Sequence, residues 1–135
     1  MLTKELVQLA QASMDKAYAP YSGFRVGAAL LCGDGTVYTG CNIENASYGA
    51  TCCAERTAFF QAVGEGHRDF AAIAICGGQN GILTNFCPPC GICRQVMAEF
   101  CDPDFQIHLT DGKEIRTHTL GELFPGSFTG ESMNP

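Results

Sequence analysis

Residues 53–76, CAERTAFFQAVGEGHRDFAAIAIC, combine a helical pattern with a strand pattern. Small side chains recur at helical spacing over residues 53–63, and Gly64 and Gly66 are typical of a helix end. Residues 70–76 then form a continuous apolar run between turn signals, which predicts a strand buried on both faces. A helix that leads into a buried strand indicates an α/β fold.

The same two patterns alternate on both sides of this stretch. We predict a helix over 4–17 with Thr3 as its N-cap, strands over 24–32 and 36–41, a helix over 91–100, strands over 105–110 and 114–119, and a helical turn over 120–124. Residues 42–52 and 77–87 are predicted loops. The alternation predicts a single domain over residues 1–135, a three-layer α/β/α sandwich around one mixed sheet of about five strands.

Charge and hydropathy disfavour several kinds of partner. The chain carries 8 Lys and Arg against 14 Asp and Glu, for a formal net charge of −6, which is unsuited to a polyanion such as DNA or RNA. The apolar run at residues 70–76 is far shorter than the ~20 residues that cross a bilayer. Residues 1–16 mix charges into their apolar positions, unlike a signal peptide. We expect a cytoplasmic protein with no nucleic-acid or membrane partner.

Nine cysteines in a chain with no secretion signal indicate metal binding or burial rather than a disulfide framework. Cys53 opens one predicted helix, and Cys90 and Cys93 lie three residues apart at the start of another, so that both can face one point. Helix N-termini favour thiolates, because they carry partial positive charge. Three thiolates directed at one point are suited to Zn²⁺.

Three ligands, rather than four, are typical of a catalytic zinc site that keeps its fourth position for water. A zinc ion lowers the pKa of that water to about 7. Glu55, two residues beyond Cys53, could accept the proton of the water and pass it to a substrate nitrogen. Three thiolates also leave zinc with a net negative charge, so Arg56 and Arg94, beside the predicted ligands, are candidates for hydrogen bonds to sulfur.

Two other metal sites stay open from the residues alone. Residues 87–93 also match the C-x₂-C-x₂-C opening of an iron–sulfur motif, although residues 97–98 are not the Cys and Pro that a ferredoxin motif requires. A closed zinc site could take Cys87 or Cys52 as a fourth ligand. That site would leave Glu55 without a role, and the protein would be a non-enzymatic zinc module.

Together the motifs resemble the zinc-dependent cytidine deaminases, in their small homotetrameric form with cysteine ligands. Five blocks in order carry the resemblance, and they are residues 18–30, 41–45, 53–58, 89–95 and 123–128. The resemblance implies hydrolytic deamination of cytidine and deoxycytidine to uridine and deoxyuridine, with release of ammonia, in pyrimidine salvage. It also implies one Zn²⁺ per chain, held by Cys53, Cys90 and Cys93.

The resemblance further implies how a pyrimidine nucleoside is bound. Glu55 would protonate ring N3 and then carry a proton to the leaving amine, and the backbone near Ala54 would meet the pyrimidine edge. Asn42 and Glu44 match a ribose-binding pair, whose amide and carboxylate can together bind a sugar hydroxyl. Phe24 matches an aromatic residue that packs on the pyrimidine face, although core packing in a buried strand is an equal alternative.

Tyr48 and Phe128 match aromatic residues that neighbouring subunits contribute, which implies a homotetramer with shared active sites. Blasticidin-S-type deaminases share the cysteine motifs but are not expected to keep Asn42 and Glu44. Deaminases that edit RNA or DNA are disfavoured by the net charge of −6. Departures from the family pattern are two extra thiols, Cys52 and Cys87, and a longer loop over residues 77–87. The histidines belong to no motif and receive no role, and they are His67, His108 and His118.

Overall fold

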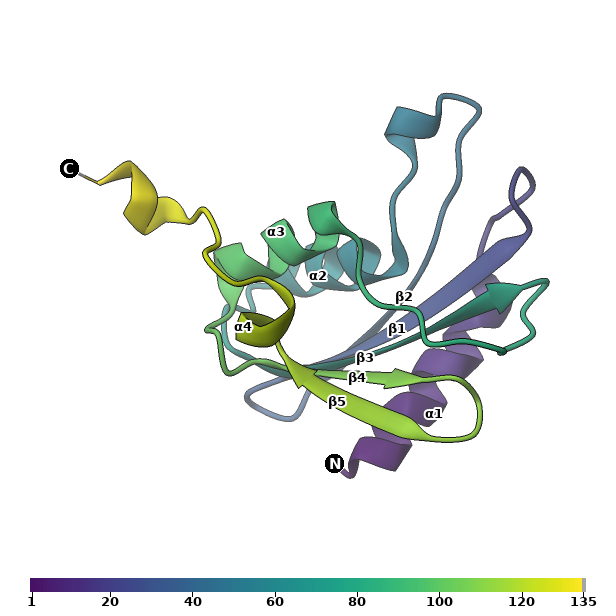
Figure 1. The fold of residues 1–135 in the computed structure, drawn as a ribbon, viewed down its shortest axis with the longest axis horizontal. Coiled ribbons are helices and arrows are strands. Elements are labelled where there is room, and N and C mark those ends of the chain that lie inside the picture. The colour runs from purple at the N-terminus through teal and green to yellow at the C-terminus, as the bar shows by residue number, and fades with distance from the viewer. Residues whose placement is uncertain (135) are drawn as a thin grey trace.

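A five-stranded sheet with the order β2–β1–β3–β4–β5 forms the centre of the computed structural model, which describes residues 1–134 (Figure 1). Its strands are β1 (Phe24–Cys32), β2 (Val37–Cys41), β3 (Phe70–Gln79), β4 (Gln106–Thr110) and β5 (Ile115–Thr119). Only β3 and β4 pair in parallel, and the three other pairs are antiparallel. The sheet is therefore mixed and five-stranded, as predicted.

Helices cover both faces of the sheet (Figure 1). The helices are α1 (Thr3–Ser13), α2 (Ala54–Gly64), α3 (Gly91–Phe100) and the single turn α4 (Leu120–Leu123). Alternate β1 side chains point to opposite sides: Ala28 and Leu30 pack with α2 and α3, whereas Ala29 packs with α1. This arrangement confirms the three-layer α/β/α sandwich.

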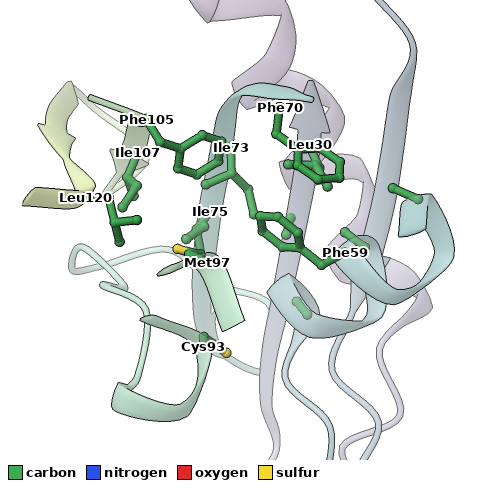
Figure 2. Close-up of a cluster of buried hydrophobic side chains, with 14 of the residues drawn as sticks. Leu30, Phe59, Phe70, Ile73, Ile75, Cys93, Met97, Phe105, Ile107 and Leu120 are labelled. Carbon is green, nitrogen blue, oxygen red and sulfur yellow. The ribbon is translucent and has the colours of Figure 1, made fainter. Parts of the chain in front are cut away.

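The two faces of the sheet have different cores. Ile73 and Ile75 of β3 join Phe59 and Met97 in a core of large side chains under α2 and α3 (Figure 2). The opposite face of β3 presents Ala72, Ala74 and Cys76 to α1. The small side chains on this face allow α1 to approach the sheet closely. The face with the large side chains carries α2 and α3, whose N-caps are Cys53 and Cys90.

The main differences from the predicted element boundaries concern α1 and β3, and the other elements differ by about one residue. Thr3 is the first residue of α1 rather than its N-cap, and Leu2 precedes the helix without a side-chain cap. α1 ends at Ser13, and a 3₁₀ turn over Met14–Lys16 completes the predicted segment. β3 extends to Gln79, where a loop was predicted, because residues 77–79 pair with the first three residues of β1. Within residues 1–134, none of the helices has the length and apolar character needed to cross a membrane.

Candidate active site

Both α2 and α3 begin at a cysteine. Cys53 is the N-cap of α2 and Cys90 is the N-cap of α3, each with an extended backbone, and neither side chain makes a capping hydrogen bond. Both thiols are therefore free to point at a shared position beyond the helix ends. Cys93 lies one turn before Met97 on α3 and is buried (Figure 2).

The close approach of α2 to the sheet fixes one side of this arrangement. A Cβ atom on Gly40 of β2 would lie 2.3 Å from the carbonyl oxygen of Ala54, so only glycine leaves room for the first turn of α2. The hydroxyl of Thr57 donates to the carbonyl oxygen of Cys41 at 2.9 Å and ties the same turn to the end of β2. The N-terminus of α2 is thus held directly against the sheet edge.

The sulfur atoms of Cys53, Cys90 and Cys93 all lie within 4.8 Å of one another. The sulfurs of Cys53 and Cys90 are 3.7 Å apart. A tetrahedral zinc ion with Zn–S bonds of ~2.3 Å holds its sulfur ligands about 3.8 Å apart. The donor type and the spacing therefore fit Zn²⁺, and three donors leave one position of a tetrahedron open.

The two extra thiols stand outside this group. Among residues 1–134, the cluster of metal-ligand atoms contains neither Cys52 nor Cys87. Burial raises the pKa of Cys52, and it raises the pKa of Cys87 to about 12. Because neither sulfur belongs to the clustered donor atoms, the geometry favours three protein ligands over a closed four-cysteine site.

Positive charge from Arg56 reaches the thiol group. The Cys93 thiol and the Arg56 guanidinium donate hydrogen bonds to Cys53, and they lower the pKa of the Cys53 thiol. The pKa of Cys93 is correspondingly raised. Arg56 Nη2 lies 3.3 Å from the Cys53 sulfur, and its buried Nε has no hydrogen-bond acceptor within the described chain. Arg56 thus places a positive charge beside the thiol group.

Arg94 does not share this role, contrary to expectation. Its Nε donates to the carbonyl oxygen of Pro89 at 2.8 Å, and its Nη1 donates to the carbonyl oxygen of Leu123. Position 94 points away from the sulfurs because it is next to Cys93, and adjacent helical residues face different directions. Arg94 instead connects the start of α3 to α4.

A cleft of about 220 Å³ adjoins the thiols. Besides Cys53 and Cys90, its lining includes five predicted residues, namely Phe24, Asn42, Glu44, Ala54 and Glu55. Glu55 lies in the first turn of α2 and is only 4% exposed. Burial, with a smaller contribution from the charge of Cys53, raises the pKa of Glu55 to about 7. A carboxyl group with such a pKa can both donate and accept a proton near neutral pH.

Asn42 lines the cleft, and its side chain makes two hydrogen bonds to the backbone at the start of β1. Its Oδ1 accepts from the backbone N–H of Val26 at 2.9 Å, and its Nδ2 donates to the carbonyl oxygen of Phe24 at 2.8 Å. Both contacts are made to the first residues of β1, so Asn42 replaces strand pairing beyond the end of β2. One N–H of the amide remains for a ligand, because Nδ2 carries two hydrogens.

Glu44 is anchored by the turn that precedes β1. Its Oε1 accepts from the backbone N–H groups of Tyr21 and Ser22, and its Oε2 accepts from the Ser22 hydroxyl. Hydrogen bonds from Ser22, chiefly from its hydroxyl, lower the pKa of the Glu44 carboxyl. Glu44 is thus a fixed carboxylate at the mouth of the cleft. Ser22 was not predicted as a site residue, and a single serine in a turn gives no sequence signal for this role.

Phe24 lies in the cleft rather than in the core. It is the first residue of β1 and is 38% exposed, and it lines the same cavity as Glu55. This placement removes the alternative of core packing, because Phe24 is exposed and belongs to neither buried cluster of the sheet. Ala54, fully buried, forms the cleft wall at the start of α2.

Neither Tyr48 nor Phe128 is among the residues that line the cleft within one chain. Tyr48 begins the 3₁₀ turn Tyr48–Ala50, is 70% exposed, and packs edge-on against Tyr21 with 5.9 Å between ring centroids. Figure 1 shows this turn projecting above the helices, and it shows the C-terminal segment that carries Phe128 leading away from the sheet. Phe128 is also exposed, and its carbonyl oxygen accepts from Gln95.

Comparison with known proteins agrees with this geometry. The family model of the cytidine and deoxycytidylate deaminase zinc-binding region matches residues 2–109. The chain belongs to this family. It is 52% identical to the cytidine deaminase of Halalkalibacterium halodurans over 135 residues, which are 99% of this chain and 96% of that relative. As a member of this zinc-binding deaminase family, the protein is a hydrolase.

A solved deaminase structure has the same fold. The crystal structure of cytidine deaminase from Burkholderia pseudomallei matches with a TM-score of 0.88 at 47% identity, over 95% of this chain and 100% of that chain. The blasticidin-S deaminase of Bacillus cereus is more distant, at 29% identity over 93% of this chain and 91% of that relative. The chain is therefore more similar to the two cytidine deaminases named above than to this blasticidin-S deaminase.

Proposed function

We propose that this protein hydrolyses the 4-amino group of cytidine and deoxycytidine, giving uridine or deoxyuridine and ammonia. The observation that carries the proposal is the position of Glu55, buried in the first turn of α2 and lining the same cleft as Cys53 and Cys90. An acid with a raised pKa beside a three-thiol group is suited to proton transfer at a hydrolytic centre. The relatives named above, which include cytidine deaminases, support the choice of substrate.

Cys53, Cys90 and Cys93 would hold one Zn²⁺ per chain. When bound, the ion would supply Lewis acidity that activates a water molecule for attack at C4 of the pyrimidine. Glu55 would take a proton from this water, deliver it to ring N3, and later carry a proton to the departing amine. Arg56 would partly neutralise the negative charge of the Cys53 thiolate by donating a hydrogen bond to its sulfur at 3.3 Å.

The other end of the cleft would recognise the sugar. The Glu44 carboxylate is fixed by Tyr21 and Ser22, and the Asn42 amide keeps one free N–H, so the pair can accept from and donate to a ribose hydroxyl. Phe24 would stack on the pyrimidine face. These contacts predict a preference for nucleosides over the free base cytosine.

We also propose that residues 1–135 act as one catalytic domain in a cytoplasmic homotetramer that serves pyrimidine salvage. The exposure of Tyr48 and Phe128 supports this assembly, because both are large side chains that a neighbouring subunit could cover. Tyr48 also lines a hollow with Ser22, Glu44 and Thr51, next to the proposed sugar site. A neighbour that binds there would complete the active site.

The experiment is a deamination assay on purified protein whose zinc content has been measured. Cytidine, deoxycytidine, free cytosine and blasticidin S are offered separately, and the ultraviolet change is followed. Turnover of both nucleosides but not of cytosine is expected. Turnover of blasticidin S alone would contradict the roles of Asn42 and Glu44, and no turnover by zinc-loaded protein would contradict the proposed reaction.

A further inference from the structure

A second group of metal-ligand atoms lies at the end of α2 remote from the cleft. The thiol of Cys32, a carboxylate oxygen of Asp34 and a ring nitrogen of His67 all lie within 4.8 Å of one another. Cys32 ends β1, Asp34 lies in the turn between β1 and β2, and His67 follows the C-terminus of α2. Three segments of the chain therefore bring sulfur, oxygen and nitrogen donors to one point.

Local contacts and burial hold the three donor residues in place. The Oδ1 atom of Asp34 accepts from the backbone N–H of Thr36 at 2.9 Å, which leaves Oδ2 directed at Nδ1 of His67, 3.7 Å away. The backbone N–H of His67 donates to the carbonyl oxygen of Ala62 at 3.0 Å, and its ring packs edge-on against Tyr38. Cys32 is only 1% exposed. The donors are thus held before any ion binds.

A second carboxylate stands beside the group. A Cβ atom on Gly33 would lie 2.2 Å from Oδ2 of Asp69, and the backbone N–H of Gly33 donates to the carbonyl oxygen of Asp69 at 2.8 Å. Asp69 therefore places further negative charge next to Cys32. Two carboxylates beside a buried thiol make a site that attracts a cation.

We propose that Cys32, Asp34 and His67 form a second zinc site, which ties the turn between β1 and β2 to the C-terminal end of α2. Mixed sulfur, nitrogen and oxygen donors select Zn²⁺ over Mg²⁺ or Ca²⁺, which take oxygen donors. Binding replaces the thiol proton of Cys32 by the metal and releases that proton to solvent. The spacing between Asp34 and His67 is already close to that of two zinc ligands. The site lies apart from the cleft, so the proposal does not rest on the proposed reaction.

Zinc stoichiometry tests the proposal. The full chain is dialysed against excess Zn²⁺, passed over a desalting column and analysed for bound metal. Two zinc ions per chain are expected in the wild type and one in His67→Gln or Asp34→Asn. Both substitutions alter side chains that are not in the core, so folding is expected to be retained. One zinc ion in the wild type, or two in both variants, would overturn the proposal.

His118→Gln is the matched control. His118 also stands near a carboxylate, with Nδ1 4.0 Å from Oε2 of Glu122, but no thiol belongs to that pair among the described donor groups. It should keep two zinc ions, and loss of one would contradict the site. The Cys32→Ser variant adds a spectroscopic readout: metal-free wild type loaded with Co²⁺ should give a stronger thiolate-to-cobalt charge-transfer band than this variant, which keeps only the thiolates of the cleft. An equal band in Cys32→Ser would contradict ligation by Cys32.

Discussion

The two ends of α2 carry two groups of metal-ligand atoms that differ in their surroundings. At the N-terminus, Cys53 joins two thiols of α3 beside a cleft and a buried carboxyl group, Glu55. Beyond the C-terminus, His67 meets Cys32 and Asp34 at a turn between two strands. At 1.5 Å per residue, the 11 residues of α2 separate the two groups by about 16 Å.

The difference shows that a set of donors does not by itself make a catalytic site. Thiols at helix N-termini gain from the positive end of the helix dipole, whereas a group beyond a helix C-terminus does not. The N-terminal group also has a cleft for a substrate and an acid, Glu55, that can move protons. In the C-terminal group, Asp34 is bound to its own turn.

The largest contrast should come from removing one ligand in each group. Cys90→Ala should reduce deamination to the uncatalysed level and remove the zinc ion of the cleft, because the remaining two thiols cannot hold a catalytic ion tightly. Cys32→Ser should leave the turnover number unchanged. Zinc content and initial rates of both variants check this. Equal losses of activity would show that the two groups are not functionally distinct.

A second contrast compares two glycines, Gly40 of β2, which packs against the start of α2, and Gly64 at the end of α2. Gly40→Ala introduces a Cβ atom 2.3 Å from the carbonyl oxygen of Ala54, and we expect turnover to fall by about 10²-fold, because a displacement of ~1 Å in a catalytic group has that effect. Gly64→Ala, at the other end of α2, meets open space and should leave turnover unchanged. Steady-state kinetics measure both. A fully active Gly40→Ala variant would refute the packing argument.

Asn42→Ala tests the sugar end of the cleft. It leaves the N–H of Val26 and the carbonyl of Phe24 without partners, which should lower the free energy of unfolding by about 1–3 kcal/mol and raise KM for cytidine. Urea unfolding and KM measurements check the two effects. Asn45→Ala is the control, because Asn45 is exposed and bonds only within its own loop. Unchanged KM and stability in Asn42→Ala would contradict both roles.

The smallest expected effect is that of His67→Gln in metal-free protein. A partly exposed histidine–carboxylate pair contributes little, so the free energy of unfolding should change by less than about 1 kcal/mol. Added Zn²⁺ should raise the melting temperature of the wild type more than that of this variant, because an ion that binds only the folded state stabilises it. Equal shifts in both proteins would argue against the second site.

Much of the fold follows from local patterns. The apolar run at residues 70–76 and the helix before it predicted β3 and α2, because burial on both faces leaves a clear signal. The extension of β3 to Gln79 could not be predicted, since two glycines carry no strand signal and pair only because β1 lies beside them. Thr3 matched a capping pattern that the chain does not use.

The parts of the candidate site that lie within short sequence motifs could be predicted. The parts that depend on contacts between distant segments could not. Cys53, Glu55 and the two α3 cysteines were found from spacing and resemblance. The anchor of Glu44 by Ser22 and the closeness of Gly40 to α2 depend on tertiary contacts between distant segments. His67 received no role because its partners lie more than thirty positions away in the sequence. Such groupings need the fold before they can be recognised.

The most direct test of the central claim compares Glu55→Gln with Glu65→Gln, at the two ends of α2, by zinc content and by the rate of cytidine deamination. Glu55→Gln should retain the zinc ion of the cleft and lose about 10²–10⁴-fold in turnover, because it removes general acid–base catalysis. Glu65→Gln should behave as wild type, since Glu65 caps the helix outside the cleft. Near-normal turnover in zinc-loaded Glu55→Gln would contradict the account.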